Sequence, residues 1–349
     1  MEKLLFKSRT RQMFHEKDEL NIKAKVVEQG IPMALRDCRI NRGIITGFNE
    51  AFVISSDLKD KFIEQDPASA QILKPLLRGK DIVNWRTASD NLWLICTHNG
   101  IKSQGIPKID ADNYPAVHQW LRKFEFELAK RHDKGDHWSN LRNCTYIQDF
   151  EQPKIIYGQH KLNFEFIYDD TEHFYCDNTA FIITGKQLKY LTCFLNSKLF
   201  RYCFKDKLIG LYGEEKPLLQ TNLDTSVKRI NETQELVFDT LVDYVTFLRK
   251  PTMPKASPYV ENYQIISTFV NIINAAVTEL YFEQETRQQE INIIDFCDFA
   301  PINNLDNQQK ANIIYQAYTR VLEYHNPIRN RMLLANIINP SITIINSRF

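Results

Sequence analysis

The spacing of apolar residues changes near residue 231, and this change limits the folds that the chain can adopt. Before it, short runs of β-branched and aromatic residues alternate with glycine turns, as at 40–54, a pattern typical of strands. After it, apolar residues recur every three or four positions, as at 232–249 and 308–324, which indicates helices with one buried face. The sequence therefore predicts a mixed α/β (α+β) fold, with a sheet and packed helices first and a helical bundle last.

This pattern divides the chain into three expected parts: a helical arm at 1–29, a domain built on a mixed sheet at 30–230, and a helical C-terminal bundle at 231–349. The strands of the sheet are expected within 40–54, 92–96, 154–157 and 181–184. Amphipathic helices are predicted at 114–131, 188–204 and 263–285. The helix at 188–204 is expected to pack on the sheet.

Composition excludes several classes of protein. The 349 residues carry 44 Lys and Arg against 43 Asp and Glu, a net charge of +1, so a purely electrostatic nucleic-acid binder is not expected. No run of about 18 apolar residues occurs, and the N-terminus lacks a signal-peptide pattern, so we expect no membrane partner. The seven cysteines form no C-x-x-C pair, which argues against a zinc ribbon and for reduced thiols in the cytoplasm.

Histidines and acidic tripeptides give weaker indications of chemistry. His132 and His137 flank two aspartates, but further zinc ligands at suitable spacing are absent, and a polar loop is the favoured interpretation. Glu214-Glu215-Lys216, with Asp206 upstream, and Asp57-Leu58-Lys59 fit the E-x-K and D-x-K patterns of metal-dependent nucleases. Such tripeptides arise by chance in a charged chain, so surface charge is favoured over a nuclease site. We therefore expect no metal and no catalytic residue in this chain.

Six cations lie beside glycines, prolines or turns. Glycine lets a backbone come close to another surface, and a cation placed there can meet a phosphate. Solvated charges paired with Asp37, Glu50, Asp81 or Asp90 are the alternative, and composition alone favours it. The six cations are Arg42, Lys74, Arg78, Lys80, Arg86 and Lys154.

The order of several short segments resembles the TaqI-like C-terminal specificity domain, or target recognition domain, of type IIG restriction-modification enzymes and N6-adenine DNA methyltransferases. The segments are Arg42-Gly43, Thr46-Gly47, Asn49, Ala51-Phe52, Lys74-Pro75, Arg78-Gly79, Asp81-Ile82, Trp138, Leu141-Arg142, Pro153-Lys154-Ile155-Ile156, Asn178-Thr179 and Leu195-Asn196-Ser197. Two later segments, Glu279-Leu280-Tyr281-Phe282 and His325-Asn326-Pro327-Ile328-Arg329, are also similar to that family. The resemblance covers residues 28–332.

The resemblance implies sequence-specific recognition of double-stranded DNA. The six cations would then position the DNA backbone, and loops would read base edges in the major groove. The expected base-reading residues are Asn49, Gln104, Arg131, Lys134, Asn140, Arg142 and Gln159.

The chain also departs from the family's enzymes. It has no N-P-P-Y loop, since Asn339-Pro340-Ser341-Ile342 differs at the third and fourth positions, and no strand-bound glycine loop for S-adenosylmethionine. The segment at 210–216 is acidic where the family is basic. We therefore expect a specificity portion or subunit that holds no cofactor, with S-adenosylmethionine in a separate methyltransferase domain and a nuclease as a further possible partner. The alternatives are a protein-interaction scaffold in a DNA-methylation or phage-defence complex, and a metal-dependent nuclease.

Overall fold

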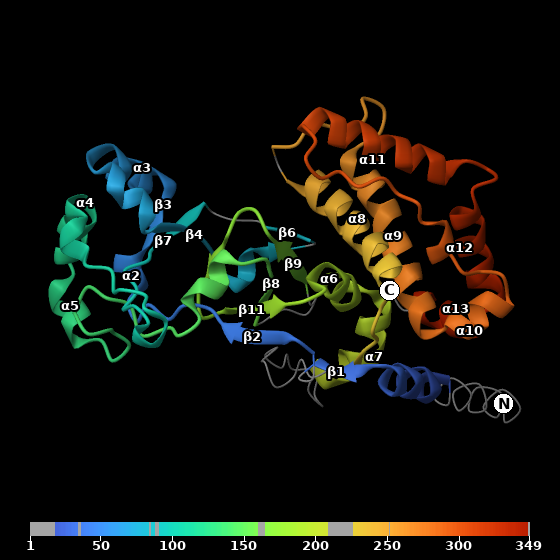
Figure 1. Cartoon of the computed structure of the whole chain (residues 1–349), viewed down its shortest axis with the longest axis horizontal. Helices are drawn as coiled ribbons and strands as arrows, with labels where there is room; N and C mark the ends of the chain where they lie inside the picture. Colours follow the sequence, from blue (N-terminus) through green and yellow to red (C-terminus); the bar gives the residue numbers. More distant parts are fainter. Residues whose placement is uncertain are drawn as a thin grey trace, which may run out of the picture. The chain divides into compact units, whose positions relative to one another are not determined.

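The chain folds into two compact units, which we call the sheet unit and the helical unit. The computed structural model describes residues 18–33, 36–83, 85–87, 91–159, 165–208, 226–250 and 252–347. The sheet unit holds residues 38–188, and the helical unit holds the described residues of 1–37, 189–216 and 221–349. Both strands and helices are present, with helices at the C-terminal end (Figure 1), which confirms the predicted mixed α/β class.

The sheet unit contains a mixed four-stranded sheet in the order β10-β4-β7-β3. β4 and β3 run antiparallel to β7, with Pro75 opposite Trp93, while β10 runs parallel to β4. Pro75 lies within β4. Because proline has no backbone N–H, this residue donates no hydrogen bond to a neighbouring strand. The strands are β3 (Val53–Ser55), β4 (Leu73–Leu77), β7 (Leu92–Ile95) and β10 (Tyr175–Cys176).

A second four-stranded sheet of the same unit is antiparallel, in the order β2-β11-β8-β9. Its strands are β2 (Cys38–Arg42), β8 (Lys154–Gly158), β9 (Phe166–Asp169) and β11 (Ala180–Gly185). The single predicted sheet is thus two sheets. The segment at 43–52 separates the strands expected within 40–54, so β2 joins one sheet and β3 joins the other.

Helices cover the mixed sheet at one end of the unit (Figure 1). The predicted helix at 114–131 is two helices that break at Lys123 and Phe124. Their apolar faces enter one core with Phe52, where Val117, Leu121 and Leu128 are fully buried. The remaining elements of the unit are α2 (Asn49–Phe52), α3 (Ser56–Gln65), α4 (Pro115–Arg122), α5 (Glu125–Lys130), the hairpin of β5 (Ile82–Val83) and β6 (Arg86–Thr87), and the 3-10 turns η2 (Pro67–Gln71), η3 (Gly79–Asp81), η4 (Lys102–Gln104), η5 (Ala111–Asn113) and η6 (Ile147–Glu151).

The helical unit contains the long C-terminal helices and a small strand pair. Residues 18–29 are helical, and β1 (Ile31–Pro32) pairs with β12 (Ser226–Val227). The other elements are α6 (Leu188–Asn196), α7 (Lys198–Leu208), α8 (Glu232–Arg249), α9 (Asn262–Tyr281), α10 (Glu283–Gln288), η8 (Ile294–Phe296), α11 (Asn307–Leu322), α12 (Pro327–Ile338) and α13 (Pro340–Ser347). The expected helix at 263–285 thus continues as two helices, which meet at Phe282.

Side-chain hydrogen bonds cap the N-termini of two long helices, α8 and α11. Asn231 accepts from the N–H of Gln234 over 2.9 Å, and Gln234 accepts from Asn231 over 3.1 Å, which is a capping box. Asp306 and Gln309 repeat this arrangement at α11. Such caps stabilise a helix by about 1 kcal/mol each.

Ser197 divides the predicted helix at 188–204. Its hydroxyl donates to Phe194 O over 2.6 Å and accepts from the N–H of Phe200 over 3.1 Å, so it closes α6 and caps α7. Serine competes in this way with the helical backbone. Most of both helices belong to the helical unit. The expected packing of this segment on the sheet, and the boundaries at 29, 230 and 349, stay predictions.

All seven cysteines are free thiols, and five of them are buried, in keeping with the reduced thiols expected from the sequence. Burial raises the pKa of Cys96 to about 12 and that of Cys144 to about 11. Thiols with such pKa values are poor nucleophiles near neutral pH. The thiols of Cys96 and Cys144 are therefore protonated near neutral pH.

Candidate nucleic-acid interface

A turn made of Asp177, Asn178 and Thr179, which we call the DNT turn, ties together the segments that carry the resemblance. Its Asp177 carboxylate accepts from the N–H of Thr179 over 3.0 Å, an Asx turn. Gly79 donates its N–H to the Thr179 hydroxyl over 2.8 Å, and Arg42 Nε donates to Asn178 O over 3.0 Å. Segments distant in sequence thus meet at one place in the sheet unit.

The glycines near the DNT turn each lie against another backbone segment of this chain, which leaves no room for a side chain. A Cβ atom on Gly43 would lie 1.9 Å from Asp177 O, and one on Gly79 would lie 2.4 Å from Thr179 O. A Cβ on Gly158 would lie 2.6 Å from Gly79 O. The expectation that Gly43 and Gly79 let DNA approach is therefore corrected, since the close neighbour of each is another segment of this chain.

Two of the predicted phosphate contacts are engaged in ion pairs. Arg78 Nε lies 3.1 Å from Asp81 Oδ2, and Asp81, which is buried, also accepts from the Arg78 N–H over 2.8 Å. Lys74 Nζ lies 2.8 Å from Glu151 Oε1. Burial raises the pKa of Glu151, but the Lys74 ammonium outweighs it and the pKa falls below its ordinary value. Both cations thus form ion pairs with acidic side chains of this chain.

Lys154 is fully buried, and the structure corrects its predicted phosphate contact. Its ammonium donates to Asp169 Oδ2 over 2.8 Å and to Phe150 O over 2.7 Å. Neither side chain of the pair is more than 3% exposed. A buried ion pair needs additional hydrogen bonds to offset its desolvation, and Asp169 accepts three of them from the backbone at 172–174. Lys154 therefore stabilises β8 and β9.

Arg42 and Arg142 are the exposed arginines of the candidate interface. Arg142 is 54% exposed and lies 2.7 Å from Asp133, while Arg42 is exposed at the end of β2. Burial raises the pKa of Tyr146 to about 12, and the charges of both arginines act in the opposite direction. The two arginines come from separate segments, the strand β2 and the loop at 131–143.

Two of the expected base-reading residues are internal, and the structure corrects their assignment. Arg131 is 8% exposed and Asn140 is 2% exposed. Asn140 donates through Nδ2 to Thr97 O over 3.2 Å and to Ile109 O over 2.8 Å. Arg131 donates to five backbone carbonyls, including Trp138 O over 2.7 Å and Asn140 O over 3.0 Å. Their polar groups therefore face the protein, where no base can reach them.

The other expected contacts lie at or near the surface. Gln104 is exposed in η4, and Lys80 is exposed in η3. Asn49 is exposed and accepts from the Thr46 hydroxyl over 2.5 Å. Lys134 is exposed and donates to Ala129 O. Gln159 is half-buried and donates its N–H to Thr179 O over 2.8 Å. Arg86 belongs to β6, and its side chain lies outside the described residues.

The sequence interpretation missed Asp177 and Asp169, but it named Asp81 as a possible partner of the cations, and Asp81 does pair with Arg78. The signal for Asp177 was present, because Asp-Asn-Thr between two strands is a common turn sequence. Asp169 pairs with Lys154, 15 residues earlier in the chain, and no local spacing shows this contact. Trp138, which belongs to the family-like segments, is partly buried and packs against the core.

One candidate nuclease pattern of the sequence falls in the part of the chain that the structure describes. Within it, no group of three His, Cys, Asp or Glu side chains could hold a metal ion. Asp57 and Lys59 lie in α3, where Lys59 pairs with Asp60 over 2.6 Å, so the D-x-K pattern is helical and not on a strand. Glu214-Glu215-Lys216 lies outside the described residues.

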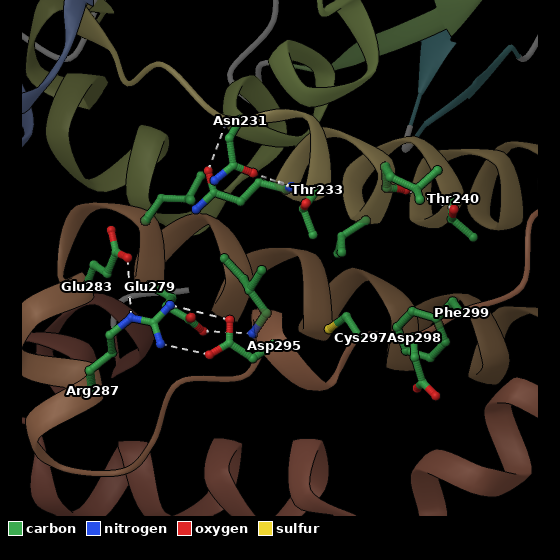
Figure 2. A pocket seen from close by; sticks show the side chains of 15 residues that line it. Asn231, Thr233, Thr240, Glu279, Glu283, Arg287, Asp295, Cys297, Asp298 and Phe299 are labelled. Atoms are coloured by element: carbon green, nitrogen blue, oxygen red, sulfur yellow. Dashed lines mark hydrogen bonds and ion pairs between the residues drawn. The ribbon is translucent and has the colours of Figure 1, made fainter.

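A hollow of about 370 Å³ lies in the helical unit, among α8, α9, α10 and residues 294–299 (Figure 2). Its charged side chains form ion pairs or hydrogen bonds within the helical unit. Arg287 lies 2.8 Å from Asp295 and 3.3 Å from Glu283, and Glu279 accepts from the backbone at 293–294. These contacts brace the bundle, and we assign no ligand to the hollow. No helix among the described residues is long and apolar enough to cross a membrane.

Comparisons with known proteins find similarity to restriction-modification enzymes. Residues 74–224 match the family model of the TaqI-like C-terminal specificity domain. Among solved structures, the type IIL restriction-modification enzyme MmeI in complex with DNA is 12% identical with a TM-score of 0.40, over 80% of this chain and 35% of that one. The type IIG restriction endonuclease BpuSI is 11% identical with a TM-score of 0.44, over 88% of this chain and 34% of that one.

The chain thus spans about a third of the length of each of these two structures. No curated protein matches it. The matched region begins at Lys74, ends within residues that the structure does not describe, and includes the DNT turn together with the loop at 131–143. The chain therefore contains a TaqI-like C-terminal specificity domain at residues 74–224.

Proposed function

We propose that this chain recognises a specific sequence in double-stranded DNA, as the specificity portion of a type II restriction-modification enzyme or an adenine-specific DNA methyltransferase. The observation that carries the proposal is the match of residues 74–224 to the specificity domain. It is supported by the DNT turn, where segments that resemble the family meet through hydrogen bonds.

The exposed polar side chains of the sheet unit supply the two kinds of contact that recognition needs. Arg42, Lys80, Lys134 and Arg142 are the candidates for phosphate contacts, which position a duplex. Gln104 and Asn49 carry amides that can bond bidentately to adenine in the major groove. With a net charge of +1, binding depends on local contacts more than on attraction to the whole chain.

The proposal includes a catalytic partner that binds S-adenosylmethionine and methylates adenine, with or without a nuclease. The helical unit offers a surface for such a partner on α12, where Leu333, Leu334 and Ile337 are 56%, 47% and 77% exposed. Contiguous apolar surface of this kind marks protein interaction sites. The partner would be another domain or a separate subunit.

Selection from a random duplex library by the purified chain tests the proposal. We expect one short motif to be enriched, with specific binding at least 1,000-fold tighter than binding to scrambled duplexes, on the order found for DNA-binding proteins. Arg42→Ala should weaken binding to every duplex, whereas Gln104→Ala should relax preference at one base pair. Arg122→Ala, on the exposed face of α4, is the matched control.

Two outcomes would contradict the proposal in different ways. Binding without enrichment, even with the methyltransferase partner present, would refute sequence recognition. It would show that the chain binds DNA without regard to sequence. No binding under either condition would favour the scaffold alternative. Enrichment only with the partner present would retain the function and assign it to the assembled enzyme.

A further inference from the structure

Arg131 connects two segments that carry candidate DNA contacts. It follows α5 and starts the loop at 131–143, in which Lys134 and Arg142 are exposed. Its Nη1 donates to Thr46 O, and the Thr46 hydroxyl in turn bonds to Asn49. One guanidinium thus joins the loop to the segment that precedes α2.

The remaining donors of Arg131 hold the loop itself. Nη2 donates to Trp138 O over 2.7 Å and to Asn140 O over 3.0 Å, and Nε donates to Leu128 O over 3.3 Å. The guanidinium carbon lies 4.6 Å from the centroid of the Phe52 ring. Carbonyl oxygens and a ring face therefore surround the cation, so its donors are directed at backbone and not at solvent.

Lysine cannot replace arginine here without loss of these bonds. A guanidinium presents five N–H donors in a rigid plane, whereas an ammonium presents three from a single nitrogen. The five carbonyls that accept from Arg131 lie on two chain segments, and the wider guanidinium group can reach both. Burial lowers the pKa of Arg131 to about 10, so the side chain stays charged at neutral pH.

The rest of the loop is held by further internal hydrogen bonds. Asn140 bonds to Thr97 O and Ile109 O, and Leu141 N–H donates to Thr97 O over 3.0 Å. Gly135 N–H donates to Asn140 O over 3.2 Å. The loop thus has a fixed backbone that presents Lys134 and Arg142 outward.

We propose that Arg131 is a positioning residue for sequence readout: it fixes the loop at 131–143 against the segment at 46–49, so that side chains on both face one duplex in register. The inference rests on the proposed function, because it assumes that these segments meet DNA. Sequence preference, rather than affinity for DNA in general, should depend on Arg131, since a loosened loop still carries its cations.

The test compares Arg131→Lys with Arg122→Lys, an exposed arginine outside the loop that pairs only with Glu125. Affinities are measured for the selected duplex and a scrambled one, at a temperature where tryptophan fluorescence reports folded protein. We expect R131K to reduce the ratio of the two affinities at least tenfold, about the discrimination of one good base contact. Affinity for the scrambled duplex should stay within about twofold of wild type, and R122K should alter neither.

An unchanged ratio in folded R131K would overturn the inference, as would an equal loss of affinity for both duplexes. A wild-type chain without sequence preference would instead contradict the proposed function. Hydrogen exchange on the wild-type chain tests the inference even where R131K does not fold. The amides of Gly135, Asn140 and Leu141 should be as protected in the free chain as in the complex, and protection that arises only with DNA would refute a prearranged loop.

Discussion

Lys154 shows how the environment of a residue, and not its type, decides its role. In sequence it is a cation beside a proline, yet its ammonium lies in the core against Asp169. Removal of one partner from a buried ion pair leaves an uncompensated charge. The same residue type at position 80 is exposed. Local sequence did not separate these two environments.

We predict that Lys154→Met lowers the free energy of unfolding of the sheet unit by about 3–5 kcal/mol, the range for a broken buried ion pair. All four tryptophans of the chain lie in this unit, at positions 85, 93, 120 and 138, so urea titration followed by tryptophan fluorescence reports on it. Lys102→Met, at an exposed position in η4, is the control. A loss as small as that of the control would mean that the pair is not formed.

Glu279 gives a prediction of pH dependence for the helical unit. Burial raises its pKa from 4.5 to about 7, although the N–H groups of Ile293 and Ile294 and the charge of Arg287 oppose this, and Asp295 adds to it. The folded state therefore binds more protons than the unfolded state between these two values. Stability contributed by the protonated carboxyl is present below pH 4.5 and is lost as pH rises toward 7.

We therefore expect the free energy of unfolding of the helical unit to fall between pH 5 and 7.5, and Glu279→Gln to flatten this decline. Denaturation followed by far-ultraviolet circular dichroism measures it, since most long helices belong to this unit. Glu283→Gln, at a partly exposed carboxylate at the start of α10, is the comparison. A decline that persists unchanged in E279Q would assign it to another group.

At the scale of elements, the DNT turn explains why glycine occurs at several of the family-like positions. We predict that Gly79→Ala severely destabilises the sheet unit, because its Cβ would lie 2.4 Å from Thr179 O. Gly105→Ala is the control: nothing lies within 4 Å of that Cβ, and only its φ of +68° is unfavourable, which costs about 1–2 kcal/mol. Thermal unfolding should rank the two in this order, and the reverse order would contradict the close approach.

Element type was predictable where one periodicity dominated. The pattern at 308–324 matches α11, and the strands at 92–96 and 154–157 match β7 and β8, because apolar spacing reports burial directly. Helix breaks were not predictable, since the apolar spacing of 114–131 continues across the gap between α4 and α5. Pairing of β2 and β3 into separate sheets depends on long-range contacts, which local sequence does not encode.

The candidate site, like the elements, was predictable only where local sequence decides the structure. The resemblance identified segments that meet in space, but it could not assign roles within them. Arg131 and Lys154 were placed with the DNA contacts because their neighbours in sequence are polar or belong to a family segment. Their partners, Thr46 and Asp169, come from elsewhere in the chain, and only the folded structure brings them together.

At the scale of the whole molecule, the nearly balanced charge limits the electrostatic contribution to the affinity for DNA. Four exposed cations, Arg42, Lys80, Lys134 and Arg142, are the candidates for phosphate contact in the sheet unit. If all four meet phosphates, the logarithm of the affinity should fall by about 3–4 for each tenfold rise in salt, at about 0.9 per phosphate. This corresponds to a loss of roughly 100-fold between 50 and 200 mM salt.

Fluorescence anisotropy with the selected duplex across this salt range measures the slope. Arg42→Ala and Lys134→Ala should each reduce it by about one, and Lys154→Met should leave it unchanged in protein that remains folded, because that ammonium never meets solvent. A slope near zero would mean that recognition proceeds without these cations. A slope near −10 would require many more contacts than the sheet unit presents here, and would assign the excess to the helical unit or to segments outside the described residues.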